Sequence, residues 1–162
     1  MPVRAPIGVV SRSAYDFFSP FLAGAECVQT NVAAQNSYCE LFNNAVDGSV
    51  LRVYGVDVFV TGNTFVFYEV YFGQHSTGSG SVQPYGAIDP RSGTLPGIVG
   101  GFTSAVCLGT HLGGLNMIAN VNRGDIRTSP LAVIPPGYSF ALQVANQNIT
   151  IQCAIYWAVI YS

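Results

Sequence analysis

Hydrophobic and polar residues alternate along much of the chain with a period of two, which is the pattern of β-strands. The longest run covers residues 149–161, where every second residue from Ile149 to Tyr161 is apolar or aromatic. Residues 138–144 alternate in the same way, and a segment rich in Asn and Gln, residues 145–148, separates the two runs. The pattern predicts two strands joined by a turn as a β-hairpin.

Further strands are predicted before and between these runs. Residues 51–60 place their apolar side chains on one face if Gly55 lies at a β-bulge, and a turn at 61–64 leads into a strand at 65–72. Five shorter candidates complete the set: 25–32, 38–42, 103–108, 115–119 and 131–134. About eight strands separated by turns predict an all-β fold, an antiparallel β-sandwich of jelly-roll type, as a single domain over residues 24–162.

The predicted strand at residues 65–72 is apolar or aromatic on both faces, and Glu69 is its one charge. Such a strand needs two partners, which are the core on one side and a neighbouring subunit or a covering segment on the other. We therefore predict a homo-oligomer, a trimer before a dimer. The residues expected near the subunit contact share one face of this strand: Phe65, Phe67 and Tyr71.

Two stretches lack the strand pattern. Residues 1–23 contain prolines and a cluster of aromatic residues, and we expect an extended N-terminal arm that lies across a neighbouring subunit. The aromatic residues expected to anchor this arm are Tyr15, Phe17, Phe18 and Phe21. Residues 73–101 hold eight of the 18 glycines, which predicts a long surface loop, a type of segment that is usually functional or mobile.

Composition narrows the function classes. Charged residues make up only 9% of the 162 residues, against roughly 25% in an average soluble protein, while hydrophobic residues make up 49%. This composition excludes a disordered chain and indicates that much of the surface is covered by other molecules. The six basic residues are all arginine and the net charge is -2, so a nucleic-acid partner, which would require a basic stripe, is disfavoured.

The sequence shows no pattern typical of export or membrane insertion. The apolar residues before Ser11 and Arg12 are too few for a secretory signal, and no uncharged apolar run reaches 18 residues. We expect a protein that is made in the cytoplasm of the cell that produces it and has no membrane partner. In that reducing compartment its four cysteines are expected to be free thiols.

Patterns for catalysis and metal binding are sparse. Ser104, His111 and Asp125 could converge only by chance, because the chain has no G-x-S-x-G motif. Cys107 and His111 are four residues apart, and in a continuous strand that spacing leaves about 13 Å between them, too far for one metal ion. We therefore predict no catalytic residues, no cofactor and no metal site.

Two segments resemble those of a known group of proteins. Residues 38–56, YCELFNNAVDGSVLRVYGV, resemble the strand-turn-strand of small virion proteins of tailed phages, although Asn44 stands where a proline is usual. Residues 130–140, PLAVIPPGYSF, and the last strand with Trp157 are similar to the proline-glycine turn and final strand of the same proteins. That group has jelly-roll or tumour-necrosis-factor-like folds and decorates heads or forms head fibres and tail tips.

The resemblance implies a non-enzymatic structural protein of the virion. We expect a head decoration or cement protein on the capsid surface, whose partners are the major capsid protein and further copies of itself. A receptor-binding domain of a head fibre or tail tip is the alternative within the same class. From another class, a carbohydrate-binding β-sandwich would require exposed Trp or Tyr beside carboxylates, whereas Trp157 lies on the predicted core face.

Overall fold

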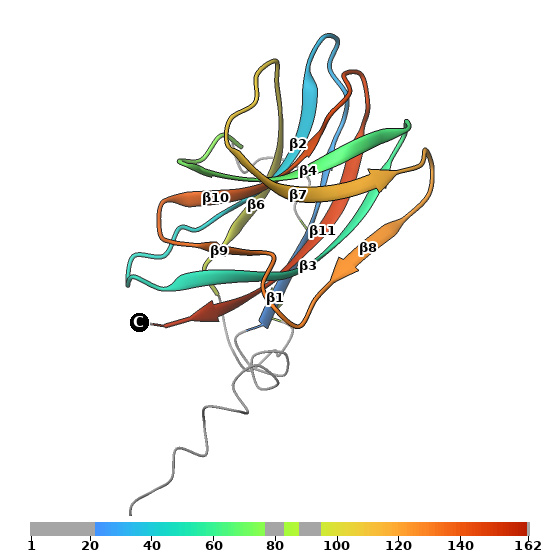
Figure 1. Ribbon diagram of the computed structural model, residues 1–162. Coiled ribbons are helices and arrows are strands. Elements are labelled where there is room, and N and C mark those ends of the chain that lie inside the picture. The colour runs from blue at the N-terminus through green and yellow to red at the C-terminus, as the bar shows by residue number, and fades with distance from the viewer. Residues whose placement is uncertain (1–21, 77–82, 88–94, 162) are drawn as a thin grey trace, which may run out of the picture.

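The computed structural model describes residues 22–76, 83–87 and 95–161, which form two antiparallel β-sheets and no helix (Figure 1). Sheet A contains β1 (Leu22–Gln29), β3 (Val50–Val60), β5 (Gln83–Ala87), β8 (Arg123–Ile126), β9 (Ala132–Ile134) and β11 (Ile151–Ile160). Sheet B contains β2 (Asn36–Phe42), β4 (Thr64–Phe72), β6 (Ile98–Ser104), β7 (Thr110–Met117) and β10 (Tyr138–Val144). Among the described residues there is no helix of the length and apolarity that a membrane span requires.

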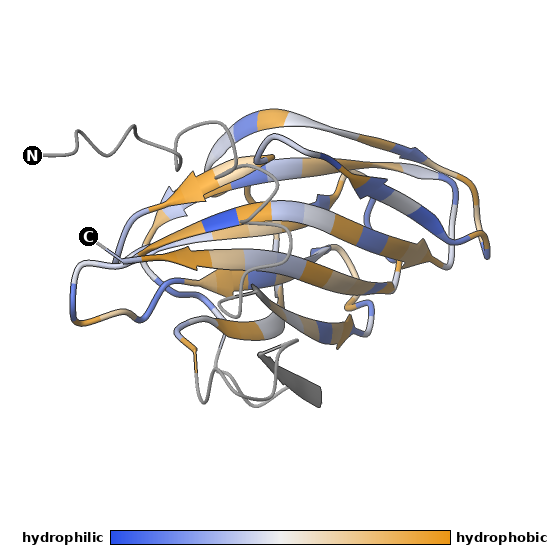
Figure 2. Ribbon diagram, turned by 90° about the horizontal axis from the view of Figure 1, so that it is seen from below, coloured by the Kyte–Doolittle hydropathy of each residue, from blue (hydrophilic) through white to orange (hydrophobic). Residues whose placement is uncertain are grey.

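The order of strands is β5-β1-β11-β3-β8 in sheet A, with β9 beside β3, and β6-β2-β10-β4-β7 in sheet B. Apolar side chains of both sheets meet in one core between them, and Figure 2 shows hydrophobic and polar residues alternating along the strands. Fully buried members of this core include Leu51, Ile151 and Ile155 from sheet A and Leu41, Phe140 and Leu142 from sheet B. The predicted all-β class is therefore confirmed, with the strands in two antiparallel sheets.

The predicted bulge in residues 51–60 is also present. Tyr156 of β11 lies opposite Gly55 of β3, whereas the next residue, Trp157, lies opposite Val53, so Tyr54 is the extra residue of the bulge. Trp157 is only 4% exposed, and its indole N–H donates to the carbonyl of Pro96 at 3.0 Å. The predicted core position of this tryptophan is thus correct.

The predicted hairpin of residues 138–161 is wrong, because β10 belongs to sheet B and β11 to sheet A. The segment between them crosses from one sheet to the other, and side chains of β2 satisfy its backbone carbonyls. Asn36 donates to the carbonyls of Val144 and Ala145, both at 2.8 Å, and Ser37 donates to that of Ile149 at 2.6 Å. A turn sequence predicts that the chain bends, but not which sheet it enters next.

The number and limits of the strands also differ from the prediction. Eleven strands are present in the described residues instead of about eight, and β5 and the first part of β6 fall within the predicted loop 73–101. In β6, Gly101 reads as a loop residue, yet a Cβ there would lie 2.7 Å from the Gln29 side chain of β1. A glycine within a strand thus lets the two sheets approach closely. The sequence pattern alone does not distinguish such a glycine from one in a flexible loop.

The N-terminal arm is predicted over residues 1–23, and β1 already includes its last two residues. The anchor residues Tyr15, Phe17, Phe18 and Phe21 lie outside the described residues. Their role therefore stays a prediction.

Candidate functional site

The predicted subunit-contact residues lie on the outer face of sheet B, away from the main core. Phe65 is 38% exposed, Phe67 is half-buried and Tyr71 is buried at 7%. Tyr71 belongs to a small second core with Tyr38, Ala141, Phe102 and Leu108. The second apolar face of β4 is therefore covered in part by a segment of the same chain, one of the two partners expected for it beside a neighbouring subunit. Phe65 stays accessible.

The same outer face holds two fully buried glutamates, Glu40 on β2 and Glu69 on β4, which both lie opposite Ala141 of β10. A buried carboxylate is costly unless hydrogen bonds or an opposite charge compensate it. Because both pair with Ala141, the two glutamates lie in one row across the sheet, on either side of β10. The groups that compensate their charges differ.

Glu40 is surrounded by hydrogen-bond donors, and Nδ1 of His75 lies 3.8 Å from its Oε2. Tyr71 donates its hydroxyl to Oε2 at 2.7 Å, and Ser76 donates its hydroxyl to Oε1 at 2.8 Å. The backbone N–H groups of His75 and Ser76 donate to the same carboxylate at 2.9 and 3.1 Å. Burial, and then the charge of Glu40, raise the pKa of Tyr71 well above its usual range, so the tyrosine remains a donor. Glu40 thus holds His75 and Ser76 against the sheet.

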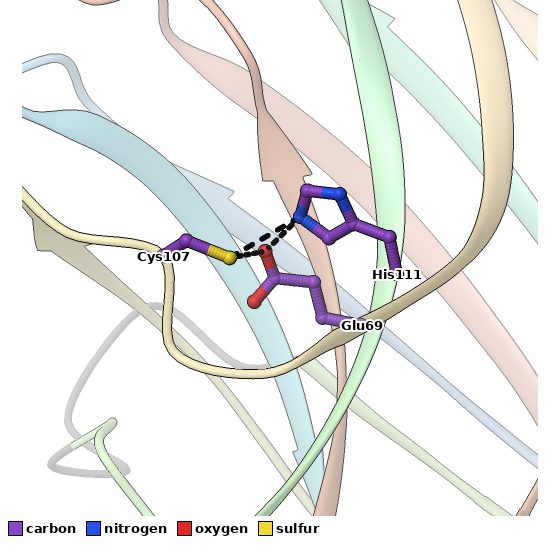
Figure 3. Close-up of side chains that lie close together, drawn as sticks. All are labelled: Glu69, Cys107 and His111. Carbon is purple, nitrogen blue, oxygen red and sulfur yellow. Dashed lines mark hydrogen bonds and ion pairs between the residues drawn. The ribbon is translucent and has the colours of Figure 1, made fainter.

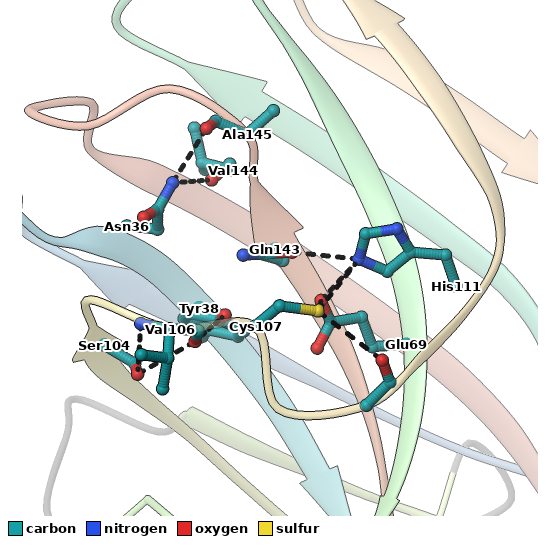
Figure 4. A network of polar contacts seen from close by, with 11 residues as sticks. Asn36, Tyr38, Glu69, Ser104, Val106, Cys107, His111, Gln143, Val144 and Ala145 are labelled. Atoms are coloured by element: carbon teal, nitrogen blue, oxygen red, sulfur yellow. Dashed lines mark hydrogen bonds and ion pairs between the residues drawn. The ribbon is translucent and has the colours of Figure 1, made fainter.

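Glu69 lies instead in a cluster with Cys107 and His111 (Figure 3). Its Oε1 is 2.8 Å from Nε2 of His111 and 3.2 Å from Sγ of Cys107. The Nε2 and Sγ atoms are themselves 3.3 Å apart. The side-chain oxygen of Gln143 is also 3.3 Å from Nε2 of His111 (Figure 4). Oε2 of Glu69 is buried and has no hydrogen-bond partner among the described residues.

A β-bulge on β7 brings His111 to this face. Tyr68 of β4 lies opposite Gly113, but the next residue, Glu69, lies opposite His111, so Leu112 is the extra residue. Leu115 and Met117 point into the core, and strict alternation from them would also turn His111 inward. The bulge reverses that alternation, and Gly113 at its centre has φ +129°, a conformation that favours glycine.

The connection between β6 and β7 brings Cys107 to the cluster. These strands are the two opposite edges of sheet B, so residues 105–109 cross the outer face of the sheet. The connection lies close to β4: a Cβ on Gly109 would be 2.6 Å from the carbonyl oxygen of Val70. The prediction that Cys107 and His111 are too far apart to share a metal ion is therefore wrong. It assumed a continuous strand, whereas Cys107 lies in the connection that precedes β7.

Other residues considered for catalysis are not brought together. Asp125 of β8 binds the Tyr68 hydroxyl and the Arg127 guanidinium, while Ser104 bonds to backbone atoms of Val106. Ser104, His111 and Asp125 each belong to a separate hydrogen-bond network.

The Cys107 cluster does not have the arrangement of a cysteine nucleophile. In a catalytic triad, one ring nitrogen of the histidine contacts the nucleophile and the other contacts the acid. Here Nε2 of His111 contacts Cys107 and Glu69 together. Desolvation, and then the hydrogen bond to Glu69, raise the pKa of the Cys107 thiol, whereas nucleophilic cysteines have a lowered pKa.

A second candidate surface follows one edge of each sheet, where no further strand of the described residues pairs. β7 ends sheet B and β8 ends sheet A, and Arg123 of β8 donates to the carbonyl of Asn116 of β7 at 2.7 Å. The two strands and the turn between them carry four exposed aliphatic side chains, which define the β7–β8 edge: Leu112 (49%), Ile118 (66%), Val121 (48%) and Ile126 (62%). β7 contains neither lysine nor proline, residues that commonly prevent an edge strand from pairing.

An open hollow lies on the outer face of sheet A, with a volume of about 360 Å³. Its lining includes two carboxylates, two amides and two aromatic rings: Glu26, Asp57, Gln152, Asn122, Tyr156 and Phe59. The Tyr156 hydroxyl donates to Asp57 at 3.1 Å.

Comparison of the chain with protein-family models, with curated proteins and with solved structures gives no match. The sites above therefore rest on geometry and chemistry alone.

Proposed function

We propose that the protein is a non-enzymatic structural protein of a tailed-phage virion, a head decoration or cement protein that binds the major capsid protein. It would bridge neighbouring capsid subunits and help the shell to resist internal pressure. The sandwich architecture and the resemblance of two of its segments to small phage virion proteins support this proposal. The exposed aliphatic side chains of the β7–β8 edge support a protein that acts by binding.

The strand pairing supports the finer assignment to the jelly-roll type. Four strands from the first half of the chain pair with strands from the second half in nested order, as in one long hairpin folded over into two sheets. Paired residues from the two halves of the chain show this nested order in both sheets: Leu22 opposite Ala158, Phe42 opposite Ser139, Val58 opposite Arg123, and Thr64 opposite Met117.

Asn43 joins the two segments that carry the resemblance. It is fully buried and donates through Nδ2 to the carbonyls of Ser49 at 2.9 Å and Ile134 at 2.8 Å. Its backbone carbonyl accepts from Gly137 at 2.9 Å. The segments 38–56 and 130–140 thus form one structural unit, which supports treating their resemblance as a single feature.

The observation that carries the proposed assembly is the β7–β8 edge. Exposed aliphatic side chains beside strands with unpaired backbone groups favour contact with another protein surface. Phe65 lies next to this edge, opposite Asn116 of β7, so one predicted contact residue adjoins it. We propose that copies of the chain associate through this edge, as a trimer before a dimer.

Charge introduced at the edge should dissociate the oligomer. We expect the double variant Ile118→Asp/Ile126→Asp to sediment as a monomer, because burying an unpaired carboxylate in an apolar contact is costly. Both side chains are exposed, so the chain itself should remain folded by circular dichroism. Val46→Asp is the matched control, since Val46 is fully exposed and lies outside the edge. An unchanged mass for the double variant would show that association uses another surface.

The hollow on sheet A favours a second candidate function, carbohydrate binding. Aromatic rings beside carboxylates and amides suit the apolar faces and hydroxyl groups of a sugar. On a glycan array, the wild type should bind a defined set of glycans and Tyr156→Ala should lose that binding. Tyr138→Ala, in sheet B, is the control and should retain it. No binding by the wild type would remove this candidate.

A further inference from the structure

The donor atoms of Glu69, Cys107 and His111 converge at one point on the outer face of sheet B (Figure 3). A tetrahedral zinc ion with Zn–N and Zn–O near 2.0 Å and Zn–S near 2.3 Å separates its ligand atoms by about 3.3–3.5 Å. The three separations here are 2.8, 3.2 and 3.3 Å. The ligand atoms therefore need to move apart by only a few tenths of an ångström to accept such an ion.

The charge of Glu69 also calls for a cation. Its side chain is fully buried, and Oε2 has no partner among the described residues. Glu40 is equally buried in the same row of the sheet, but hydrogen bonds satisfy both of its oxygens. The contrast indicates that Glu40 is structural, whereas Glu69 keeps coordinating capacity that the chain does not use.

A fourth ligand is at hand, and an ion can reach the site from solvent. The side-chain oxygen of Gln143, 3.3 Å from Nε2 of His111, is placed to act as a fourth ligand or to hold a water molecule there (Figure 4). Cys107 is exposed and the His111 side chain is 38% exposed, so an ion has access from solvent.

We propose that Glu69, Cys107 and His111 bind a zinc ion, which fastens the connection between β6 and β7 onto β4. A thiolate with an imidazole selects a borderline transition metal over Mg²⁺ or Ca²⁺, which prefer oxygen ligands. On binding, the Cys107 thiol releases its proton to solvent and its sulfur becomes a ligand. The proposal is independent of the proposed function.

The test uses the full chain, reduced and free of any histidine tag. Co²⁺ added to the metal-free protein should give the visible absorption of a tetrahedral site with one thiolate, saturating at one ion per chain and lost on addition of Zn²⁺. At a free zinc concentration about a hundred times Kd, Tm should rise by roughly 5–10 °C. Failure to bind Co²⁺ or Zn²⁺ at one ion per chain would overturn the proposal.

Variants locate the ion. Cys107→Ser and His111→Asn should each weaken zinc binding by at least about 100-fold, since even outer partners of a metal site contribute 10–100-fold. His75→Asn, the control at the only other histidine, should change Kd by less than about twofold because His75 lies beside Glu40 and contributes no donor atom to the cluster. Full binding by Cys107→Ser would place the ion elsewhere and contradict the proposal.

Thiol labelling gives a readout that does not depend on any variant. Cys107 is exposed while Cys27, Cys39 and Cys153 are buried, and burial raises the pKa of the Cys39 and Cys153 thiols. In the native metal-free protein, Ellman's reagent should therefore label one thiol quickly. Zinc should protect that thiol, and the protected residue should be Cys107 by mass spectrometry. Equal labelling with and without zinc would contradict the site.

Discussion

Replacing Asn43 with alanine is expected to lower the free energy of unfolding by about 3 kcal/mol. The truncation leaves two buried carbonyl groups, those of Ser49 and Ile134, without their donor, and the N–H of Ala45 without its acceptor. Because this side chain joins the segments 38–56 and 130–140, both should loosen together. Urea unfolding followed by circular dichroism measures the loss.

The adjacent Asn44 is the matched control for this prediction. It is exposed and accepts a single hydrogen bond, from the N–H of Gly97 at 2.8 Å. Asn44→Ala should therefore cost no more than about 1 kcal/mol. Equal costs for the two variants would show that Asn43 does not hold the segments together.

The two buried glutamates should respond very differently to the same isosteric change. In zinc-free protein, Glu40→Gln is expected to cost about 3 kcal/mol, because the amide group cannot accept the hydrogen bonds that one carboxylate oxygen receives. Glu69→Gln should cost about 1 kcal/mol, since Oε2 of Glu69 has no donor among the described residues to lose.

This comparison is made by urea unfolding in the presence of a chelator, with each variant measured beside the wild type. Both residues are fully buried on the same face of sheet B, so the difference between them reports hydrogen bonding rather than burial. A cost for Glu69→Gln as large as that for Glu40→Gln would mean that Glu69 is already compensated. That result would remove the main reason for placing a cation beside it.

Much of the fold could be predicted from the alternation of residues, including the long strands and the bulge at Gly55. The pairing could not, because the turn residues at 61–64 and 145–148 are compatible with a hairpin and with a crossing between sheets. The short strand β8 has no apolar alternation and gave no signal.

The candidate metal site depends on features that a period-two pattern does not contain. The bulge at Leu112 turns His111 outward, and the connection that crosses the sheet before β7 brings Cys107 to it. One signal was present in the sequence: Glu69 is a lone charge in a strand that is apolar on both faces. A charge in that position requires a partner, which makes the residue a candidate for a site even where the partner is not evident.

The most direct test of the proposed function compares virions with and without the protein at low resolution by electron microscopy. Particles of the phage that the proposal requires and of a mutant that lacks the gene for this chain would be imaged under the same conditions. We expect discrete density on the outer surface of the head in the first, absent in the second and restored when the purified protein is added. Density lost only from the tail would favour the receptor-binding alternative, and identical particles would contradict a virion role.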